Sequence, residues 1–162
     1  MSEPAWLGTA RRHLGVAEIP GKEHAPQIQG WLINLKAWWR DDETPWCGVF
    51  VAECMRETHI ALPQHWYRAK GWLDWGQPTV PPSVGSVVVF ERTGGGHVGL
   101  VVGRDQYDSL MVIGGNQGNR VSIAPFARGR VVGYRWPREI RLPPLGRLPL
   151  VNSDGQLSTQ ES

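Results

Sequence analysis

The sequence predicts an α+β fold in which N-terminal helices pack on a C-terminal antiparallel β-sheet of about five strands. Apolar residues recur at helical spacing up to about residue 76, and beyond residue 82 they form short β-like runs separated by turns. Pro78, Pro81 and Pro82 separate the two halves. Helices followed by an antiparallel meander are typical of the α+β class.

The composition indicates one globular domain with aromatic surfaces. The chain has 162 residues, a formal charge of +2, nine tryptophans, twenty glycines and thirteen prolines. So small a charge gives no reason to expect a nucleic-acid partner. The sequence has no run of eighteen apolar residues, so no membrane span is predicted. Two cysteines without a Cys-x-x-Cys motif argue against a disulfide scaffold and a zinc site. We therefore expect no metal and no cofactor.

The first two predicted helices each carry one apolar stripe at helical spacing. The first stripe consists of Trp6, Leu7, Ala10 and Leu14, and the second of Ile28, Trp31, Leu32, Leu35 and one of Trp38 and Trp39. Gly15 ends the first helix, and a turn-rich loop over residues 18–26 leads to the second. A further short helical segment, with Ala69, Trp72 and Leu73, is predicted and is stopped by Gly76.

The rest of the chain is organised around a helix predicted over residues 45–58. Thr44 is expected to cap this helix, and Pro45 suits its first position. Cys47 then falls in the first turn, where unpaired amides and the positive helix end stabilise a thiolate. Gly48 leaves the backbone beside it open to a substrate. The apolar stripe of this helix is Cys47, Phe50, Val51, Cys54 and Met55.

The two cysteines are predicted to differ in role. Cysteine is often an inert core residue, so Cys47 alone does not establish catalysis. Cys54 lies seven residues on, about 10 Å along the helix, which is too far for a disulfide. It also lacks the open helix end, so we predict that Cys54 is a core residue and Cys47 the candidate nucleophile.

Five β-strands are predicted in the second half. They are Val87–Phe90, Val98–Val102, Leu110–Ile113, Arg120–Ile123 and Val131–Trp136. Hydrophobic periodicity stops at Arg141. We therefore expect a catalytic domain over residues 1–140 and a flexible C-terminal tail over residues 141–162.

Among the five histidines, His97 is the candidate base. It follows three glycines and opens a strand, which is a rim position with room for a substrate. If Gly103 lies opposite Leu110 in a hairpin, Asn116 lies across from His97, about 5 Å away on the same face. The asparagine carbonyl can then orient the imidazole. The alternative is that His97 merely ends a strand and that Asn116 is a turn residue with left-handed backbone geometry.

Five stretches of the chain, in order, resemble the motifs of one family. They are Glu18–Gly21, Pro45–Phe50, Ala69–Gly76, Gly96–Gly103 and Gly114–Gln117. From Trp6 to Pro137 the chain resembles the CHAP-type (cysteine- and histidine-dependent amidohydrolase/peptidase) peptidoglycan hydrolases of the papain-like superfamily, in the phage- and prophage-associated group. The resemblance implies a papain-like fold, with Cys47 as nucleophile, His97 as base and Asn116 as third member. Gly85-Ser86 departs from it, since relatives often carry Gly-Asp there.

Nucleophile, base and orienting residue together predict a cysteine hydrolase that works through a thioester. The resemblance implies that its substrate is an amide of the cell-wall peptide, which it would cleave as an amidase or endopeptidase. Around them we expect substrate-binding residues. Trp46 and Trp75 are candidates for lining a groove, although core packing is the usual role of tryptophan. Asp42 is either a polar wall of the site or a residue that complements the helix dipole. His24 and Gln117 are expected to contact substrate from loops.

Two alternatives remain open. One is a non-catalytic wall-binding module, in which only the tryptophans matter; the other is a secreted antibacterial effector with the same chemistry and an immunity protein as partner. The first residues show no signal peptide, so we expect a protein made in the cytoplasm and delivered to the wall by outside machinery. We also expect a monomer.

Overall fold

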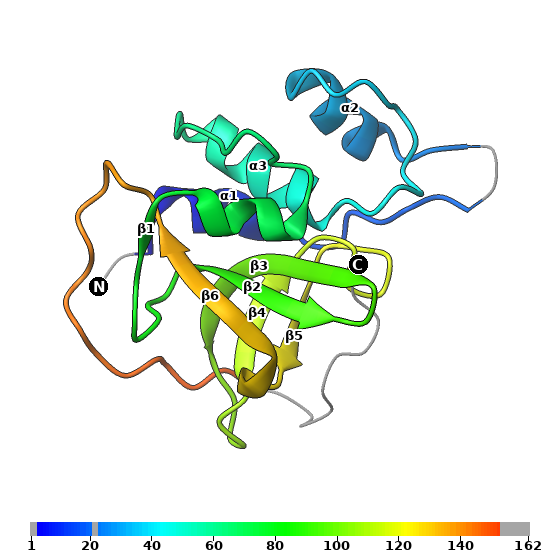
Figure 1. Cartoon of the computed structure of the whole chain (residues 1–162). Helices are drawn as coiled ribbons and strands as arrows, with labels where there is room; N and C mark the ends of the chain where they lie inside the picture. Colours follow the sequence, from blue (N-terminus) through cyan, green and yellow to red (C-terminus); the bar gives the residue numbers. More distant parts are fainter. Residues whose placement is uncertain (1–2, 21–22, 153–162) are drawn as a thin grey trace.

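The helix that carries Cys47 is buried along most of its length and lies against the sheet in the computed structural model, which describes residues 3–20 and 23–152. This helix, α3 (Cys47–Glu57), belongs to a helical layer on one face of the sheet (Figure 1). The other helical segments are α1 (Ala5–Arg12), α2 (Pro26–Asn34) and the 3-10 turns η1 (Ala69–Asp74) and η2 (Arg128–Arg130). Within the described ranges, no helix has the length and apolar character needed to cross a membrane.

The sheet has six strands in the order β1-β6-β2-β3-β4-β5, and every neighbouring pair is antiparallel. The strands are β1 (Gln77–Pro78), β2 (Val87–Arg92), β3 (Gly95–Arg104), β4 (Leu110–Gly114), β5 (Ser122–Phe126) and β6 (Val131–Trp136). The predicted α+β class, with helices on an antiparallel sheet, is therefore confirmed. The sequence pattern missed only β1, because two residues are too short to show a period.

Helices α1 and α2 end earlier than their apolar stripes suggested. Leu14 lies beyond α1 and is 44% exposed. Helix α2 begins with Pro26 and ends before Lys36, whose φ of 60° is left-handed. Trp38 and Trp39 therefore lie in the loop that follows α2 and not on the helix.

The start of α3 also differs from the prediction. Its N-cap is Trp46, without a side-chain capping hydrogen bond, so Thr44 and Pro45 precede the helix. The chain before them is turned by Asp41, whose Oδ1 accepts the N–H groups of Glu43 and Thr44 at 3.1 and 2.6 Å. Asp41 thus shapes the approach to the helix.

The alternating strand residues divide into two cores. One set packs under the helices with the apolar face of α3. The other set, on the opposite face, surrounds the stacked rings of Phe90 and Phe126, whose centroids are 4.6 Å apart. Both sides of the sheet are therefore apolar, which explains why the strands appear as unbroken apolar runs in the sequence.

The expectation of an unpacked tail from Arg141 onward does not hold for residues 148–151; residues 153–162 lie outside the described part. Leu148 is only 7% exposed in the second core. The N–H of Arg104 donates to the carbonyl of Pro149, and the N–H of Val151 donates to the carbonyl of Arg104. Gly103 permits this approach, since a Cβ there would lie 2.5 Å from the carbonyl oxygen of Pro149.

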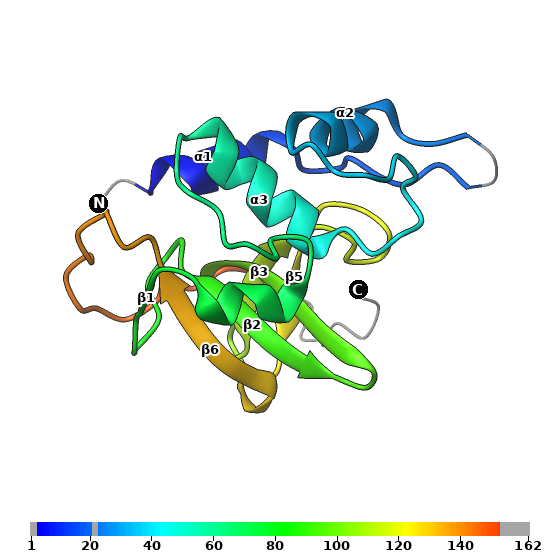
Figure 2. The same cartoon turned by 45° about the horizontal axis from the view of Figure 1, so that its top comes forward.

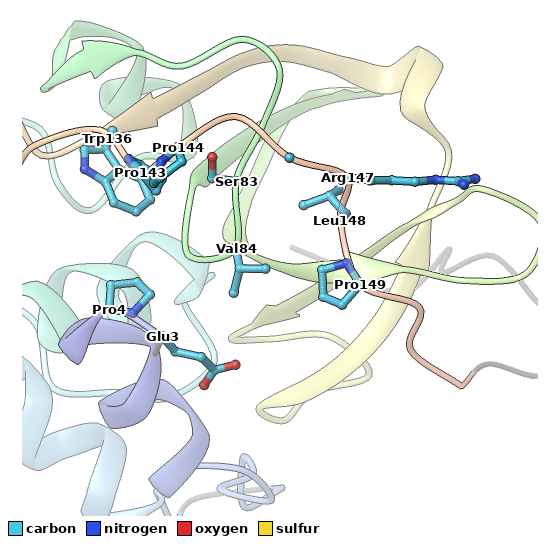
Figure 3. A pocket seen from close by; sticks show the side chains of 11 residues that line it. Glu3, Pro4, Ser83, Val84, Trp136, Pro143, Pro144, Arg147, Leu148 and Pro149 are labelled. Atoms are coloured by element: carbon cyan, nitrogen blue, oxygen red, sulfur yellow. The ribbon is translucent and has the colours of Figure 1, made fainter. Parts of the chain in front are cut away.

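The returning segment also encloses a cavity of about 520 Å³ against the N-terminus and the end of β6 (Figure 3). Its wall includes Pro4, Val84, Trp136 and Leu148. None of the residues predicted to carry the chemistry lines it. The cavity therefore belongs to the packing of the C-terminal segment.

Replacing Leu148 by Ala should lower the free energy of unfolding by about 2 kcal/mol or more, because it removes a buried side chain from the second core. The matched control is Leu145→Ala, three residues earlier, where the side chain is 78% exposed and little change is expected. Urea denaturation measures both variants. Equal stability of the two variants would mean that the segment contributes nothing to the fold.

Candidate active site

The N-terminal end of α3, where Cys47 is placed, faces strand β3 and the loop that follows β4 (Figure 2). Cys47 is the first residue of α3 and is 4% exposed. The main-chain N–H of Val98, the residue after His97, points at its sulfur, as do the N–H groups of Gly48 and of Cys47 itself. The predicted nucleophile and the strand that carries the predicted base are therefore in contact.

The thiol of Cys47 is not held as a thiolate, contrary to the expectation from its helix position. Burial raises its pKa to about 11, although the three N–H groups and the positive charge of Arg92 lower it. The reason is that removal from water disfavours the charged form more than the helix end favours it. Any reaction at Cys47 must therefore begin with removal of a proton.

His97 is fully buried, so the expected open rim position is wrong. Its ring lies parallel to that of Phe126, with centroids 5.3 Å apart and planes at 8°. It also faces the ring of Phe90, the residue paired with His97 on β2. Its Nε2 is 2.9 Å from Oε1 of Gln117. The stacked phenylalanine rings thus fix the plane of the imidazole, and the hydrogen bond to Gln117 fixes its rotation within that plane.

The orientation of the Gln117 amide sets the tautomer of His97. Nε2 of Gln117 donates to the carbonyls of Ser122 and Val112, at 2.9 and 3.3 Å. Its Oε1 must therefore face His97, and an amide oxygen can only accept. His97 Nε2 consequently carries the hydrogen, and in the neutral ring the basic lone pair is on Nδ1.

Gln117 takes the place predicted for Asn116. The β3–β4 register is as expected at Leu100 opposite Ile113, but a bulge at Val102 places Gly103 opposite Met111. Strand β4 ends at Gly114, so no ladder pairing extends to Asn116, whose φ of 60° is left-handed. Its Oδ1 is buried and accepts no hydrogen bond. The expected acceptor for His97 is therefore corrected from Asn116 to Gln117, which was predicted only to touch substrate.

Asp42 is a buried anchor for the chain at Ile19 and at His24 and Ala25, and not a wall facing substrate. Its side chain is fully buried; Oδ2 accepts the N–H groups of Ile19 and Ala25 at 2.9 and 2.8 Å, and Oδ1 lies 3.0 Å from Nδ1 of His24. Burial raises the pKa of Asp42, but these hydrogen bonds outweigh it and the net shift is downward. The hydrogen bond to Asp42 raises the pKa of His24. His24 is therefore tied to Asp42, with its side chain 26% exposed.

Trp46 and Trp75 are both buried, so the core alternative applies to each. Nε1 of Trp46 donates to Oε1 of Glu18 at 2.8 Å, and that of Trp75 donates to the carbonyl of Ala61. The ring of Trp46 also packs on Gly115, where a Cβ would lie 2.8 Å from it. Trp46 thus connects the start of α3 to the loop that holds Gln117.

Two residues near the site had no assigned role. Glu18 fixes Trp46, and its pKa is raised by burial despite that hydrogen bond. Glu18 belongs to the Glu18–Gly21 motif, and that motif was the sequence signal that could have identified its role. Arg92 was not detected, because its influence on Cys47 arises only from strand pairing. Within residues 3–20 and 23–152, no cluster of three or more His, Cys, Asp or Glu residues could hold a metal ion.

Comparison with known families identifies one match. Residues 39–116, just under half of the chain, match the CHAP domain family. The matched stretch includes Cys47 and His97 and ends at Asn116, one residue before Gln117. The match supports a hydrolase that acts on peptidoglycan, and the α+β fold is consistent with the papain-like architecture of such domains. No curated protein matches the chain.

Asp42→Ala should lower the free energy of unfolding by about 3 kcal/mol, because it leaves the N–H groups of Ile19 and Ala25 without an acceptor. Asp42→Asn is the matched control, since its amide oxygen can still accept from both. Neither variant should change KM in the folded enzyme. A raised KM with an unchanged free energy of unfolding would mean that Asp42 contacts substrate after all.

The stabilising effect of the His24–Asp42 pair should depend on pH. The lowered pKa of Asp42 contributes stability above the ordinary value of 3.8, which is lost as the pH falls through the lowered pKa. The raised pKa of His24 contributes stability below 6.5, which is lost as the pH rises through the raised pKa. The stability difference between wild type and Asp42→Asn should therefore be largest between these values.

Gln117→Ala should reduce kcat about 10²-fold, because the ring of His97 loses its orienting acceptor. Asn116→Ala is the control: the side chain accepts nothing at Oδ1, so turnover should change much less. Gln117→Glu keeps the acceptor and adds a charge that favours the protonated imidazole, so the acid limb of the pH–rate profile should move upward. Melting curves accompany each profile. A greater kinetic effect of Asn116→Ala than of Gln117→Ala would return the role to Asn116.

Proposed function

We propose that the protein is a peptidoglycan hydrolase that cleaves an amide bond of the cell-wall peptide by a thiol mechanism. Cys47 is the nucleophile, His97 the general base and acid, and Gln117 the residue that positions His97. The observation that carries the proposal is the convergence on Sγ of N–H groups from α3 and β3, where the β3 donor is Val98, the residue after His97, and His97 is itself held by Gln117. The CHAP match supplies the class of substrate.

In the first half of the reaction, Nδ1 of His97 takes the proton of the Cys47 thiol as the sulfur attacks the amide carbon. The pKa of about 11 makes this proton transfer necessary at neutral pH. The negative charge that develops on the carbonyl oxygen is stabilised by the N–H of Cys47 at the helix start. His97 then gives the proton to the leaving nitrogen as the C–N bond breaks, which leaves a thioester on Cys47.

In the second half, His97 removes a proton from water as the water oxygen attacks the thioester carbon. The C–S bond breaks, a carboxylic acid is released, and the sulfur recovers its proton from His97. Gln117 remains neutral throughout. A neutral acceptor orients the ring without placing a negative charge beside it.

For the biological setting, we propose a lysin of the phage or prophage type that acts at the cell wall. The five ordered motifs that resemble this group support that setting. An antibacterial effector would use the same residues, so the two differ in their gene neighbourhood: a lysis cassette supports the lysin, and an adjacent immunity gene contradicts it.

Cys47→Ala should abolish the release of new amines and carboxyl groups from purified peptidoglycan, because no other group can form the thioester. The matched control is Cys54→Ala on the same helix, where the thiol is fully buried and burial raises its pKa well above 9.0. This control should lose about 1–2 kcal/mol of stability but retain activity.

Mass spectrometry of the digested muropeptides identifies the bond that is cut. Fragments split at an amide, in wild type and Cys54→Ala but not in Cys47→Ala, support the proposal. Full lysis by folded Cys47→Ala would refute the assigned nucleophile. Binding to peptidoglycan without any cleavage by wild type would instead indicate a wall-binding module.

A further inference from the structure

The exposed tryptophan surface of the protein is concentrated in one place. All nine tryptophans lie in the described residues, and six of them are buried. The other three are Trp38, which is 86% exposed, and the half-buried Trp39 and Trp66. Single exposed aromatic residues are common on protein surfaces, but a contiguous group marks a binding surface.

These three tryptophans and Tyr67 form one continuous cluster, which we call the aromatic surface. Trp38 contacts Trp39 edge to face at 4.8 Å, and Trp39 stacks on Trp66 at 6.0 Å with planes at 21°. Trp39 also contacts Tyr67 edge to face at 5.9 Å. Trp39 and Trp66 pack on the main core, so the inner side of the surface is anchored while Trp38 projects into solvent.

The aromatic surface is joined directly to the candidate active site. It is built from the loop after α2 and the segment before η1, both of which pass the N-terminal end of α3 (Figures 1 and 2). The contact is made at Gly48, next to Cys47. A Cβ on Gly48 would lie 2.5 Å from the carbonyl oxygen of Trp66 and 2.9 Å from the carbonyl carbon of Tyr67.

Several charged groups near the aromatic surface are engaged within the chain, and the guanidinium of Arg68 lies over the ring of Tyr67, 5.6 Å from its centroid. The guanidinium of Arg40 donates to the carbonyls of Ala37 and Trp39, which also braces this loop. Asp41 accepts main-chain N–H groups, and Lys70 forms an ion pair with Glu91. What the surface offers is therefore mainly aromatic ring area, which suits an uncharged ligand with an apolar face more than the charged stem peptide.

We infer that the aromatic surface binds the sugar rings of the glycan strand while the attached peptide enters the site of Cys47. The C–H groups on one face of a pyranose ring are attracted to the negative face of an aromatic π-system, and the sugar hydroxyls remain in water. This inference rests on the proposed function for the identity of the polymer, but its test does not require turnover.

The experiment measures binding by the full chain carrying Cys47→Ala, so that no substrate is consumed. The probes are peptide-free glycan strands and, separately, sugar-free stem peptides, followed by calorimetry. Adding Trp38→Ala should weaken binding to the glycan strands about tenfold, the scale of one lost aromatic contact. The matched control is Tyr107→Ala, an aromatic side chain 64% exposed in the β3–β4 turn, which should leave binding unchanged.

Equal glycan affinity with and without Trp38 overturns the inference, as does binding of stem peptides but not of glycan strands. Trp38→Phe, which keeps a ring, should restore part of the affinity and covers the case in which the alanine variant does not fold. Glycan binding that depends on Trp38, in a protein whose wild type cleaves nothing, would leave the aromatic surface in place and refute only the hydrolase.

Discussion

The site depends on one side chain, the amide of Gln117. Its nitrogen donates to carbonyls from Val112 and Ser122, and its oxygen accepts from His97. A buried amide has few ways to satisfy both ends, and this arrangement leaves only one orientation of the group. The ladder at the end of β4 and the tautomer of the histidine are therefore fixed by the same group, so the chemistry is tied to the fold of the sheet.

A second constraint comes from the loops before α3. Asp42 accepts the N–H groups of Ile19 and Ala25, and Glu18, next to Ile19, accepts from Trp46. Trp46 in turn lies against Gly115, close to Gln117 in the chain. The chain of contacts runs from a buried carboxylate to the segment that carries the orienting amide. Residues far apart in sequence thus hold the nucleophile helix and the histidine strand in a fixed relation, with no disulfide and both cysteines free.

Much of this architecture could be predicted from hydrophobic periodicity and from the glycines and prolines that separate the helices and strands. The helical stripe through Cys47, the apolar runs of the strands and the glycines before His97 are local signals, and they located both the fold class and the strand that meets the nucleophile. The exchange of Asn116 for Gln117 could not be predicted, because it depends on where β4 ends and on a left-handed residue among glycines. The pKa of Cys47 was mispredicted for a similar reason, since burial is a property of the packed structure. The packing of Leu148 was missed because a single returning segment has no period.

The contact at Gly48 has a mechanical consequence. Backbone meets backbone there, with no side chain in between that could rotate or yield. The main chain of Trp66 and Tyr67, which carries the inner part of the aromatic surface, is therefore held at a fixed length from Cys47. A polymer bound at one end of that length would present to the sulfur only the bond that lies at the matching distance along its peptide branch. One amide among chemically similar ones would then be selected by spacing and not by contacts at the bond itself.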